Sequence, residues 1–289
     1  MSNLDLARQF YAEELRAVAN LQSEAVVRAF AKVPREHFLG PGPWQIMSPW
    51  WPEAEPSYRT TPDADPRRLY HNVLVAIDPE RWLNNGQPSF LAFLIDALKL
   101  QEGEHVVHVG CGTGYYTAIL AEVVGPKGRV TAIEIDPELA GRARRNVSYL
   151  AHVEVTEGDG GEYDPGPSDA ILINAGVTHP RSIWLDSLRL GGRLLFFLTA
   201  ETETDGIGGG HVLKVTCEPG GFACRFISQV GVFSCLGTRD PELNRRLTEA
   251  FSRGDWKSVQ SLRRDAHEPA DTCWLHSDNF CLSRLDVAE

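Results

Sequence analysis

The stretch Val106-Val107-His108-Val109-Gly110-Cys111-Gly112-Thr113-Gly114-Tyr115 decides the fold, because it joins a short apolar run to a helix-prone segment at 116–124. Three glycines at alternate positions separate the two. Glycine lets the backbone approach a ligand where a Cβ would block it. The start of a helix adds unpaired N–H groups and a partial positive charge. The pattern therefore predicts a strand, a ligand-binding turn and a helix.

Apolar strands alternate with helices on both sides of this turn. The expected strands are 105–109, 129–135, 152–156, 169–174 and 192–198, and the expected helices are 115–124, 137–149 and 180–189. This alternation is typical of a mostly parallel sheet with crossover helices. Residues 212–217 and 222–233 are expected to add antiparallel strands around a tight turn. The sequence therefore predicts an α/β, doubly wound, Rossmann-like sheet.

The segments before this core are predicted to be helical or irregular. Residues 4–32 have the three-to-four apolar spacing of one helix, and residues 90–100 have that of another, capped by Ser89. A short strand is expected at 69–77. Residues 40–66 are rich in Pro and Trp and predict an ordered loop, either stapled to the body or acting as a lid over the substrate.

The segments after the core are expected to pack on it. Residues 200–211 resemble an exposed loop, residues 240–262 one or two helices, and residues 265–289 a tail that docks on the body. We therefore expect three parts. Residues 1–100 are the N-terminal helices and lid, residues 101–235 the core, and residues 236–289 a C-terminal extension.

Composition limits the classes of function. The 289 residues are 43% hydrophobic and 23% charged, which is typical of a globular protein. The net charge of −11 disfavours nucleic acid and anionic membranes as partners. No apolar run approaches the length of a membrane span, and residues 1–20 lack the apolar segment of a signal peptide. We expect a cytoplasmic protein.

The cysteines and most histidines have no regular ligand spacing. The six cysteines, at 111, 217, 224, 235, 273 and 281, form no CxxC pair, and free thiols in a reducing compartment are expected. A zinc site built from Cys217, Cys224, Cys235 and a histidine is the alternative. The histidines without ligand spacing are His71, His152, His211 and His276. No metal site is therefore assigned.

Two acidic residues lie where a ligand of the glycine turn would reach them. Glu134 lies twenty residues after Gly114, at the end of the second predicted strand. A carboxylate there can accept hydrogen bonds from both hydroxyls of a ribose. Asp159, between Gly158 and Gly160, follows the third strand and can accept from an adenine amino group. In a doubly wound sheet, ligands bind at the carboxyl ends of the strands.

The glycine spacing separates two classes of cofactor. A dinucleotide site has the pattern GxGxxG, whose sixth position is Tyr115 in this chain. Glycines at 110, 112 and 114 fit S-adenosylmethionine better. That ligand has no pyrophosphate, and acidic surroundings suit its sulfonium. We therefore expect S-adenosylmethionine as the cofactor.

Several motifs together resemble one family. They are Val107–Glu122, Ile133-Glu134, Gly158–Gly160, Asp169–Ile173, Leu190–Leu194, Val33-Pro34-Arg35-Glu36-His37-Phe38 and Asn85-Gly86-Gln87-Pro88. They resemble the protein-L-isoaspartate O-methyltransferases, class I S-adenosylmethionine-dependent enzymes. The resemblance covers about residues 20–235, and the insert at 40–66 and the tail after about 238 lie outside it. It implies the methyltransferase form of the sheet, with an antiparallel C-terminal strand and an N-terminal helix. The helical C-terminal extension is expected from the sequence pattern at 240–262 instead.

The resemblance also implies an activity and a site. The activity is methyl transfer to the carboxylate of an isoaspartyl residue in a peptide or protein. The implied cofactor residues are His108, Gly110, Cys111, Gly112, Gly114, Tyr115, Glu134, Ile135, Gly158, Asp159, Gly160 and Asn174. The implied catalytic segment is Asn85, Gly86 and Gln87. A carboxylate is already ionised near neutral pH, so alignment and desolvation can supply most of the acceleration without an acid–base pair.

The chain departs from the family pattern at two positions. Gly86 stands where the family has a loop serine, and Asn84, Asn85 or Ser89 are candidates to replace its hydrogen bonds. Slower methylation by Asn85→Ala would support this. His108 stands where the family has an acid, and it is either a core histidine or a contact near the methionine end of the cofactor. A further histidine, His179, is a candidate for substrate contact.

Two other functions remain open at this point. One is methylation of a small molecule or a modified peptide on the same scaffold, with a pocket remodelled by residues 40–66 and the tail. The other is a cofactor-binding or interaction module without catalysis. The cofactor residues argue against the second, and the missing serine argues for it.

Overall fold

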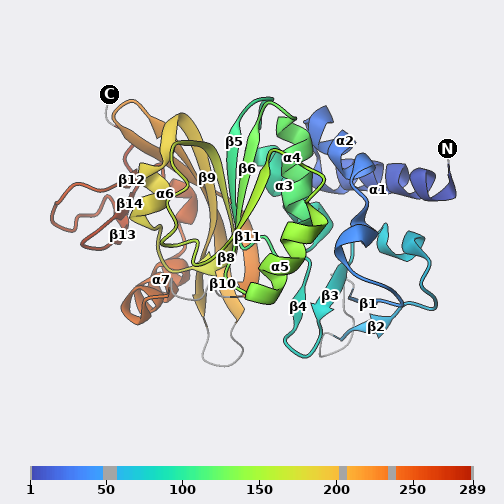
Figure 1. Ribbon diagram of the computed structural model, residues 1–289. Coiled ribbons are helices and arrows are strands. Elements are labelled where there is room, and N and C mark those ends of the chain that lie inside the picture. Colours follow the sequence, from blue (N-terminus) through green and yellow to red (C-terminus); the bar gives the residue numbers. More distant parts are fainter. Residues whose placement is uncertain (1, 48–56, 202–206, 234–238, 288–289) are drawn as a thin grey trace. The chain divides into compact units, whose positions relative to one another are not determined.

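The structure is a computed structural model that describes residues 2–47, 57–201, 207–233 and 239–287. The chain forms two compact units (Figure 1). The first unit holds the chain up to residue 104 together with residues 111–157, and the second holds residues 105–110 and the chain from residue 158. The three-part division expected from the sequence stays a prediction.

The first unit begins with two helices rather than the single helix expected at 4–32. Helix α1 spans Asn3–Ala19, and helix α2 spans Glu24–Lys32. The break lies at Asn20, which adopts the left-handed conformation (φ 51°) and ends α1. Asparagine tolerates this conformation better than most residues. The apolar spacing continues through the break, and for this reason periodicity alone missed it.

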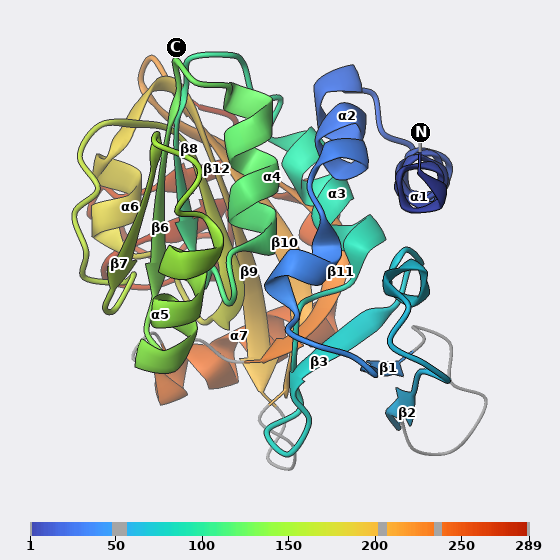
Figure 2. The same ribbon diagram turned by 45° about the vertical axis from the view of Figure 1, so that its right-hand side comes forward.

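A small antiparallel sheet follows (Figure 2). Its strands are β1 (Gln45–Met47), β2 (Arg59–Thr60), β3 (Leu74–Asp78) and β4 (Leu83–Asn84), in the order β2-β1-β3-β4. The strand expected at 69–77 begins only at Leu74, because Pro66–Leu69 form a 3-10 helix. Parts of the expected loop at 40–66 are therefore strands.

Trp44 anchors this region to the first unit. Its ring is buried against Leu39, Leu69 and Val75, and its Nε1 donates a hydrogen bond to the Gly40 carbonyl at 3.0 Å. The segment is therefore fixed to the first unit at Trp44. Trp50 and Trp51 lie outside the described residues, and a lid role for residues 40–66 stays a prediction.

Helix α3 spans Pro88–Ala97, two residues earlier than expected at its start. Gln87 is its N-cap residue and makes no side-chain cap bond, while Ser89 lies inside the helix. The prediction that Ser89 caps this helix is wrong. Proline is favoured at the first helical position because it has no N–H to leave unpaired, and Pro88 therefore sets the helix start.

The rest of the first unit follows the sequence prediction closely. Helix α4 spans Tyr115–Val124, strand β6 Arg129–Glu134, helix α5 Pro137–Asn146 and strand β7 Val153–Glu157. Strands β6 and β7 are parallel, and α5 is their crossover. Helix α4 packs beside α2 (Figure 2).

The second unit contains a long mixed sheet. Its central strands are β5 (His105–Val109), β8 (Ser168–Val177), β9 (Leu188–Glu201), β10 (Ile207–Glu218) and β11 (Gly221–Phe233). Strands β5, β8 and β9 are parallel neighbours, and β9, β10 and β11 are antiparallel neighbours. The fold is α/β with parallel central strands and antiparallel additions, as expected.

Three expectations for the second unit need correction. Helix α6 covers only Ser182–Asp186 of the expected 180–189. Strand β9 begins at Leu188, before the expected strand start at 192, so Gly191-Gly192 lie inside it. Residues 200–201 belong to β9 and residues 207–211 to β10, so the expected loop at 200–211 is shorter. A glycine-rich strand has a weak apolar pattern, and the sequence therefore did not predict these strand ends.

The C-terminal extension is only partly helical. It contains helix α7 (Pro241–Arg253), a 3-10 helix at Trp256–Ser258, and strands β12 (Ser261–Arg263), β13 (Cys273–His276) and β14 (Cys281–Ser283). These strands continue the sheet in the order β11-β12-β14-β13. Trp274 is buried against Phe226 and Phe251, so this tail docks on its own unit. No helix in the described ranges is long and apolar enough to cross a membrane.

Candidate functional site

The glycine turn has the open geometry that its sequence predicts. Gly110, Gly112 and Gly114 have φ values of 74°, 56° and 93°, a region that residues with a Cβ seldom adopt. A Cβ at Gly112 would meet no atom within 4 Å, so the backbone there faces open space. Gly114 caps α4 without a side-chain bond, and the first N–H groups of the helix have no intrahelical partner.

Glu134 holds this turn from the end of β6. Its Oε2 accepts a hydrogen bond from the Gly112 N–H at 2.7 Å, and its Oε1 accepts one from the Asp136 N–H at 3.1 Å. An ionised carboxylate can accept about four hydrogen bonds, so capacity remains for a ligand. The next residue, Ile135, is 43% exposed and offers an apolar surface beside that carboxylate.

Three of the predicted cofactor residues have buried side chains. The Tyr115 ring packs against Phe30 and Phe38, away from solvent. Cys111 is buried, and this burial raises the pKa of its thiol. Burial lowers the pKa of His108 in β5 to about 4, so its imidazole is neutral near pH 7. All three side chains are buried, and contact of these residues with the cofactor stays a prediction.

The second unit brings another set of predicted residues together. The Asn174 Nδ2 donates to the Gly110 carbonyl at 3.4 Å. A Cβ on Gly160 would lie 2.3 Å from a methyl group of Val109, so only glycine fits there. The Asp159 Oδ1 accepts from the Gly161 N–H at 2.7 Å and shapes the loop that begins at Gly158.

The loop Asn85-Gly86-Gln87 joins β4 to α3 in the first unit. Gly86 has φ 78°, and a Cβ there would lie 3.1 Å from a methyl group of Leu91. The serine of the family pattern would be strained and crowded in this backbone. The Tyr116 hydroxyl donates to the Gly86 carbonyl at 3.2 Å. Tyr116 is the second residue of α4, so this hydrogen bond connects the loop to the helix that the glycine turn begins.

Asn85 is held by a buried arginine of the Val33–Phe38 segment. Arg35 is 0% exposed. Its guanidinium donates to the Leu69 carbonyl at 2.6 Å, to the Val73 carbonyl at 2.7 Å and to the Asn85 Oδ1 at 3.1 Å. The same Oδ1 accepts from the Val75 N–H at 3.2 Å. Asn85 therefore positions the loop. The only sequence feature that could have indicated this role of Arg35 is its place just after an amphipathic helix.

Gln87 is the accessible side chain of this loop. It is half-buried, whereas Asn85 and Ser89 are buried. The Gln87 Nε2 donates to the Ser89 Oγ at 3.3 Å, and the Ser89 N–H donates to the Asn72 Oδ1 at 3.0 Å. An amide nitrogen carries two hydrogens. One of them is therefore left for an acceptor such as a carboxylate.

His179 follows β8 in the second unit. Its Nδ1 lies 3.0 Å from the Thr178 Oγ1. Burial lowers the pKa of this imidazole, and the nearby Arg181 adds to the effect, so the ring is neutral near pH 7. Contact with a substrate stays a prediction for this residue.

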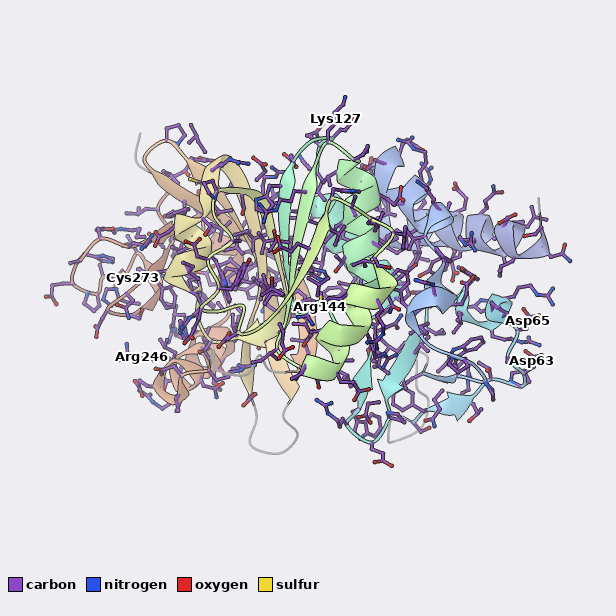
Figure 3. The ribbon with its side chains drawn as sticks, in the orientation of Figure 1. Asp63, Asp65, Lys127, Arg144, Arg246 and Cys273 are labelled. Atoms are coloured by element: carbon purple, nitrogen blue, oxygen red, sulfur yellow. The ribbon has the colours of Figure 1, made fainter. Side chains whose placement is uncertain are left out.

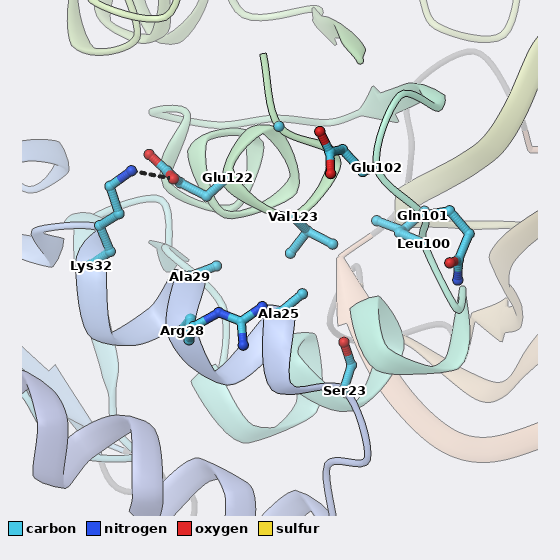
Figure 4. A pocket seen from close by; sticks show the side chains of 11 residues that line it. Ser23, Ala25, Arg28, Ala29, Lys32, Leu100, Gln101, Glu102, Glu122 and Val123 are labelled. Carbon is cyan, nitrogen blue, oxygen red and sulfur yellow. Dashed lines mark hydrogen bonds and ion pairs between the residues drawn. The ribbon is translucent and has the colours of Figure 1, made fainter. Parts of the chain in front are cut away.

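The first unit also has a surface pocket of about 530 Å³ (Figure 4). It lies between α2 and the C-terminal end of α4, where the Lys32 ammonium pairs with Glu122 at 2.6 Å. Helix α4 has ten residues and the glycine turn lies at its other end, roughly 15 Å away at 1.5 Å per residue. This pocket is therefore separate from the glycine turn.

The parallel strands, the open glycine turn and the carboxylate at the end of β6 are the features expected of a Rossmann-like methyltransferase. A family model for protein-L-isoaspartate(D-aspartate) O-methyltransferase matches residues 62–205. A protein-L-isoaspartate O-methyltransferase 1 from Archaeoglobus fulgidus is 34% identical over 209 residues, covering 70% of this chain and 83% of that protein. A protein-L-isoaspartate O-methyltransferase from Gloeobacter violaceus is 30% identical over 225 residues, covering 74% of this chain and 94% of that protein.

Solved structures show the same fold. One protein-L-isoaspartate O-methyltransferase superposes with a TM-score of 0.59 at 22% identity, covering 85% of this chain and 69% of that chain. A Plasmodium falciparum structure, described as a beta-aspartate methyltransferase in complex with S-adenosyl-L-homocysteine, superposes with a TM-score of 0.57 at 17% identity. It covers 79% of this chain and 97% of that chain.

This chain belongs to the protein-L-isoaspartate O-methyltransferase family. It is an enzyme that uses S-adenosylmethionine. The glycine turn fits this cofactor, because the backbone at Gly112 faces open space and an acceptor for ribose hydroxyls adjoins it.

Replacing Glu134 with glutamine should weaken cofactor binding. Glutamine has one carbonyl oxygen in place of two charged acceptors, and a hydrogen bond to a charged group contributes about 1.5–3 kcal/mol. The Kd for S-adenosylhomocysteine, measured by calorimetry, should rise about 10- to 100-fold. Glu154→Gln, on the exposed face of β7, is the matched control and should bind like the parent. Equal Kd values for the two variants would refute the assignment.

Proposed function

We propose that this chain methylates the side-chain carboxylate of isoaspartyl residues in peptides or proteins. The relatives named for this activity cover most of the chain. The observation that carries the proposal is the hydrogen bond from Tyr116 to the Gly86 carbonyl. It connects the loop in the family's acceptor position to helix α4, whose start forms the glycine turn.

We assign the cofactor contacts as follows. Backbone groups of Gly112 and Gly114 face the ligand, and the Glu134 carboxylate accepts from the ribose. Ile135 supplies an exposed apolar surface for the flat adenine ring. For Gly110, Gly158, Asp159, Gly160 and Asn174, which belong to the second unit, contact with the cofactor stays a prediction. Free cysteines in the described part of the chain support a reducing, cytoplasmic location.

Methyl transfer requires the chain to align the methyl donor with the acceptor carboxylate, and it does not require the chain to transfer a proton. When bound, S-adenosylmethionine supplies an electrophilic methyl group on a sulfonium. The acceptor carboxylate is ionised near neutral pH and needs no general base. Gln87 orients this carboxylate through its free amide hydrogen, and Asn85 keeps the loop in place through Arg35. Holding the two reactants in line is a recognised source of large rate acceleration.

A second acceptor class is favoured by Gly86. The family's serine is absent, and the left-handed backbone with Leu91 close by leaves no room for it. An acceptor that relies on the serine hydroxyl would bind less well here. A modified peptide or small-molecule carboxylate is therefore the alternative substrate.

The two acceptor classes are separated by one assay. The enzyme is incubated with methyl-labelled S-adenosylmethionine and either an isoaspartyl peptide or its normal aspartyl twin. We expect label on the isoaspartyl peptide only, released by mild base as expected for a methyl ester. The measurement is base-volatile radioactivity against time.

Two results would contradict the isoaspartyl proposal. Label transferred only to compounds of a cell metabolite extract would support the alternative acceptor. Cofactor binding without turnover on any of these acceptors would indicate a module without catalysis.

Gln87→Glu should lower methylation without harming the fold. The exchange is isosteric and brings a negative charge close to the acceptor carboxylate, at a cost of about 1–4 kcal/mol. We expect kcat/KM for the isoaspartyl peptide to fall at least about tenfold, mainly through KM. An acid at the N-cap of α3 interacts favourably with the helix end, so thermal stability should be kept.

Gln101→Glu makes the same exchange on the exposed loop before β5 and is the matched control. It should leave kcat/KM near the parent value. If Gln87→Glu also keeps the parent kcat/KM, the side chain of Gln87 does not meet the acceptor carboxylate.

A further inference from the structure

Four potential metal ligands gather in the C-terminal extension of the second unit. They are His267, Cys273, His276 and Cys281, and their ligand atoms all lie within 4.8 Å of one another. Cys273 is labelled in Figure 3, at the start of β13. None of these residues belongs to the proposed methyltransferase site, so the group is independent of the proposed function.

The strand pairing explains how the sequence brings them together. His276 in β13 and Cys281 in β14 are directly opposite partners and share a face of the hairpin. Cys273 lies three residues before His276, and regular alternation would place it on the opposite face. The register shifts between Cys273 and Leu275, and this bulge returns Cys273 to the shared face. His267 comes from the loop before β13.

Local hydrogen bonds prepare two of the ligands. The His267 Nδ1 lies 2.8 Å from the Asp265 carbonyl, and its Nε2 lies 3.6 Å from the Cys273 sulfur. Donation of the other ring N–H to a backbone carbonyl is usual for a metal-binding histidine. The Ala270 N–H donates to the same sulfur at 3.5 Å. The ring and the sulfur therefore face each other before any ion binds.

The remaining groups also favour an ion. The His276 Nδ1 is buried and has no hydrogen-bond partner in the described part of the chain. An unpaired, buried ring nitrogen is a ready-made ligand, and the Cys273 sulfur lies within 4.8 Å of the ring's ligand atom.

We propose that His267, Cys273, His276 and Cys281 bind one zinc ion in a tetrahedral, structural site. Zinc bonds of about 2.3 Å to sulfur and about 2.0–2.1 Å to nitrogen place the ligand atoms of a tetrahedron about 3.3–3.8 Å apart. Side-chain rotations can close the present separations to that range. Two thiolates with two imidazoles select zinc over magnesium or calcium. Four protein ligands leave no open position for catalysis.

The zinc ion links the loop at 264–272 to the β13–β14 hairpin through its four ligands. Trp274 lies between two of the ligands in sequence and packs against Phe226 and Phe251. The His276 carbonyl accepts a hydrogen bond from Arg246 of α7 at 3.2 Å. Binding of zinc therefore stabilises the contact of the whole extension with the sheet of this unit.

The test is the metal content of the full-length protein, purified under reducing conditions and loaded with zinc. We expect one zinc per chain in the parent and in Cys217→Ser, a free cysteine of β10 that serves as the control. Cys273→Ser and His267→Ala should lose the ion. Replacing zinc with cobalt should give the thiolate-to-cobalt absorption of a tetrahedral site, weakened in Cys273→Ser.

A second measurement distinguishes the loss of zinc binding from misfolding of a variant. A chelator should lower the melting temperature of the parent and of Cys217→Ser, and it should leave that of His267→Ala unchanged. His267 is only half-buried, so this variant should fold. Parent protein with reduced thiols that takes up no zinc would overturn the proposal. So would a Cys273–Cys281 disulfide in the protein purified without reductant, with zinc uptake unaffected by His267→Ala.

Discussion

The hydrogen bond from the Tyr116 hydroxyl to the Gly86 carbonyl is the link on which the site depends. Helix α4 starts at the glycine turn, and its second residue reaches the loop that precedes α3. On the other side of the turn, the Glu134 carboxylate holds the Gly112 N–H. The first unit thus carries the glycine turn and the loop Asn85-Gly86-Gln87 in one hydrogen-bonded arrangement. Sites held in this way on rigid elements keep the alignment that transfer reactions need.

The loop Asn85-Gly86-Gln87 depends in turn on a buried cation. Arg35 places its charge among neutral oxygens, the carbonyls of Leu69, His71 and Val73 and the amide oxygen of Asn85. Its Nη1 and Nη2 atoms are paired in this way, which offsets part of the cost of burying the charge, while Nε has no hydrogen-bond partner in the described part of the chain. Loss of the arginine would also leave several buried carbonyls without a donor. The position of Asn85, and with it the backbone at Gly86, is therefore set by a residue 50 positions away in the sequence.

The sequence predicts the features that depend on local pattern. The strand, the glycine turn and α4 follow from neighbouring residues, and β6, α5 and β7 from their apolar spacing. The break at Asn20 was missed because the backbone conformation of that residue overrides a continuous apolar pattern. The strand through Gly191-Gly192 was missed because pairing with a neighbouring strand overrides the local pattern. The role of Arg35 and the approach of His276 to Cys281 were missed for a different reason. They arise from contacts between distant segments and from a bulge, which no residue spacing reveals.

The central claim is that the cofactor contacts the backbone of the glycine turn. Cys-Gly and Thr-Gly each occur once in the chain, at Cys111-Gly112 and Thr113-Gly114. Protein labelled with carbonyl-¹³C cysteine or threonine and with ¹⁵N glycine therefore gives one selected amide signal for each glycine. Adding S-adenosylhomocysteine should shift both signals, and Gly254, selected through Arg253, should stay in place. Unchanged Gly112 and Gly114 signals at saturating ligand would contradict the account.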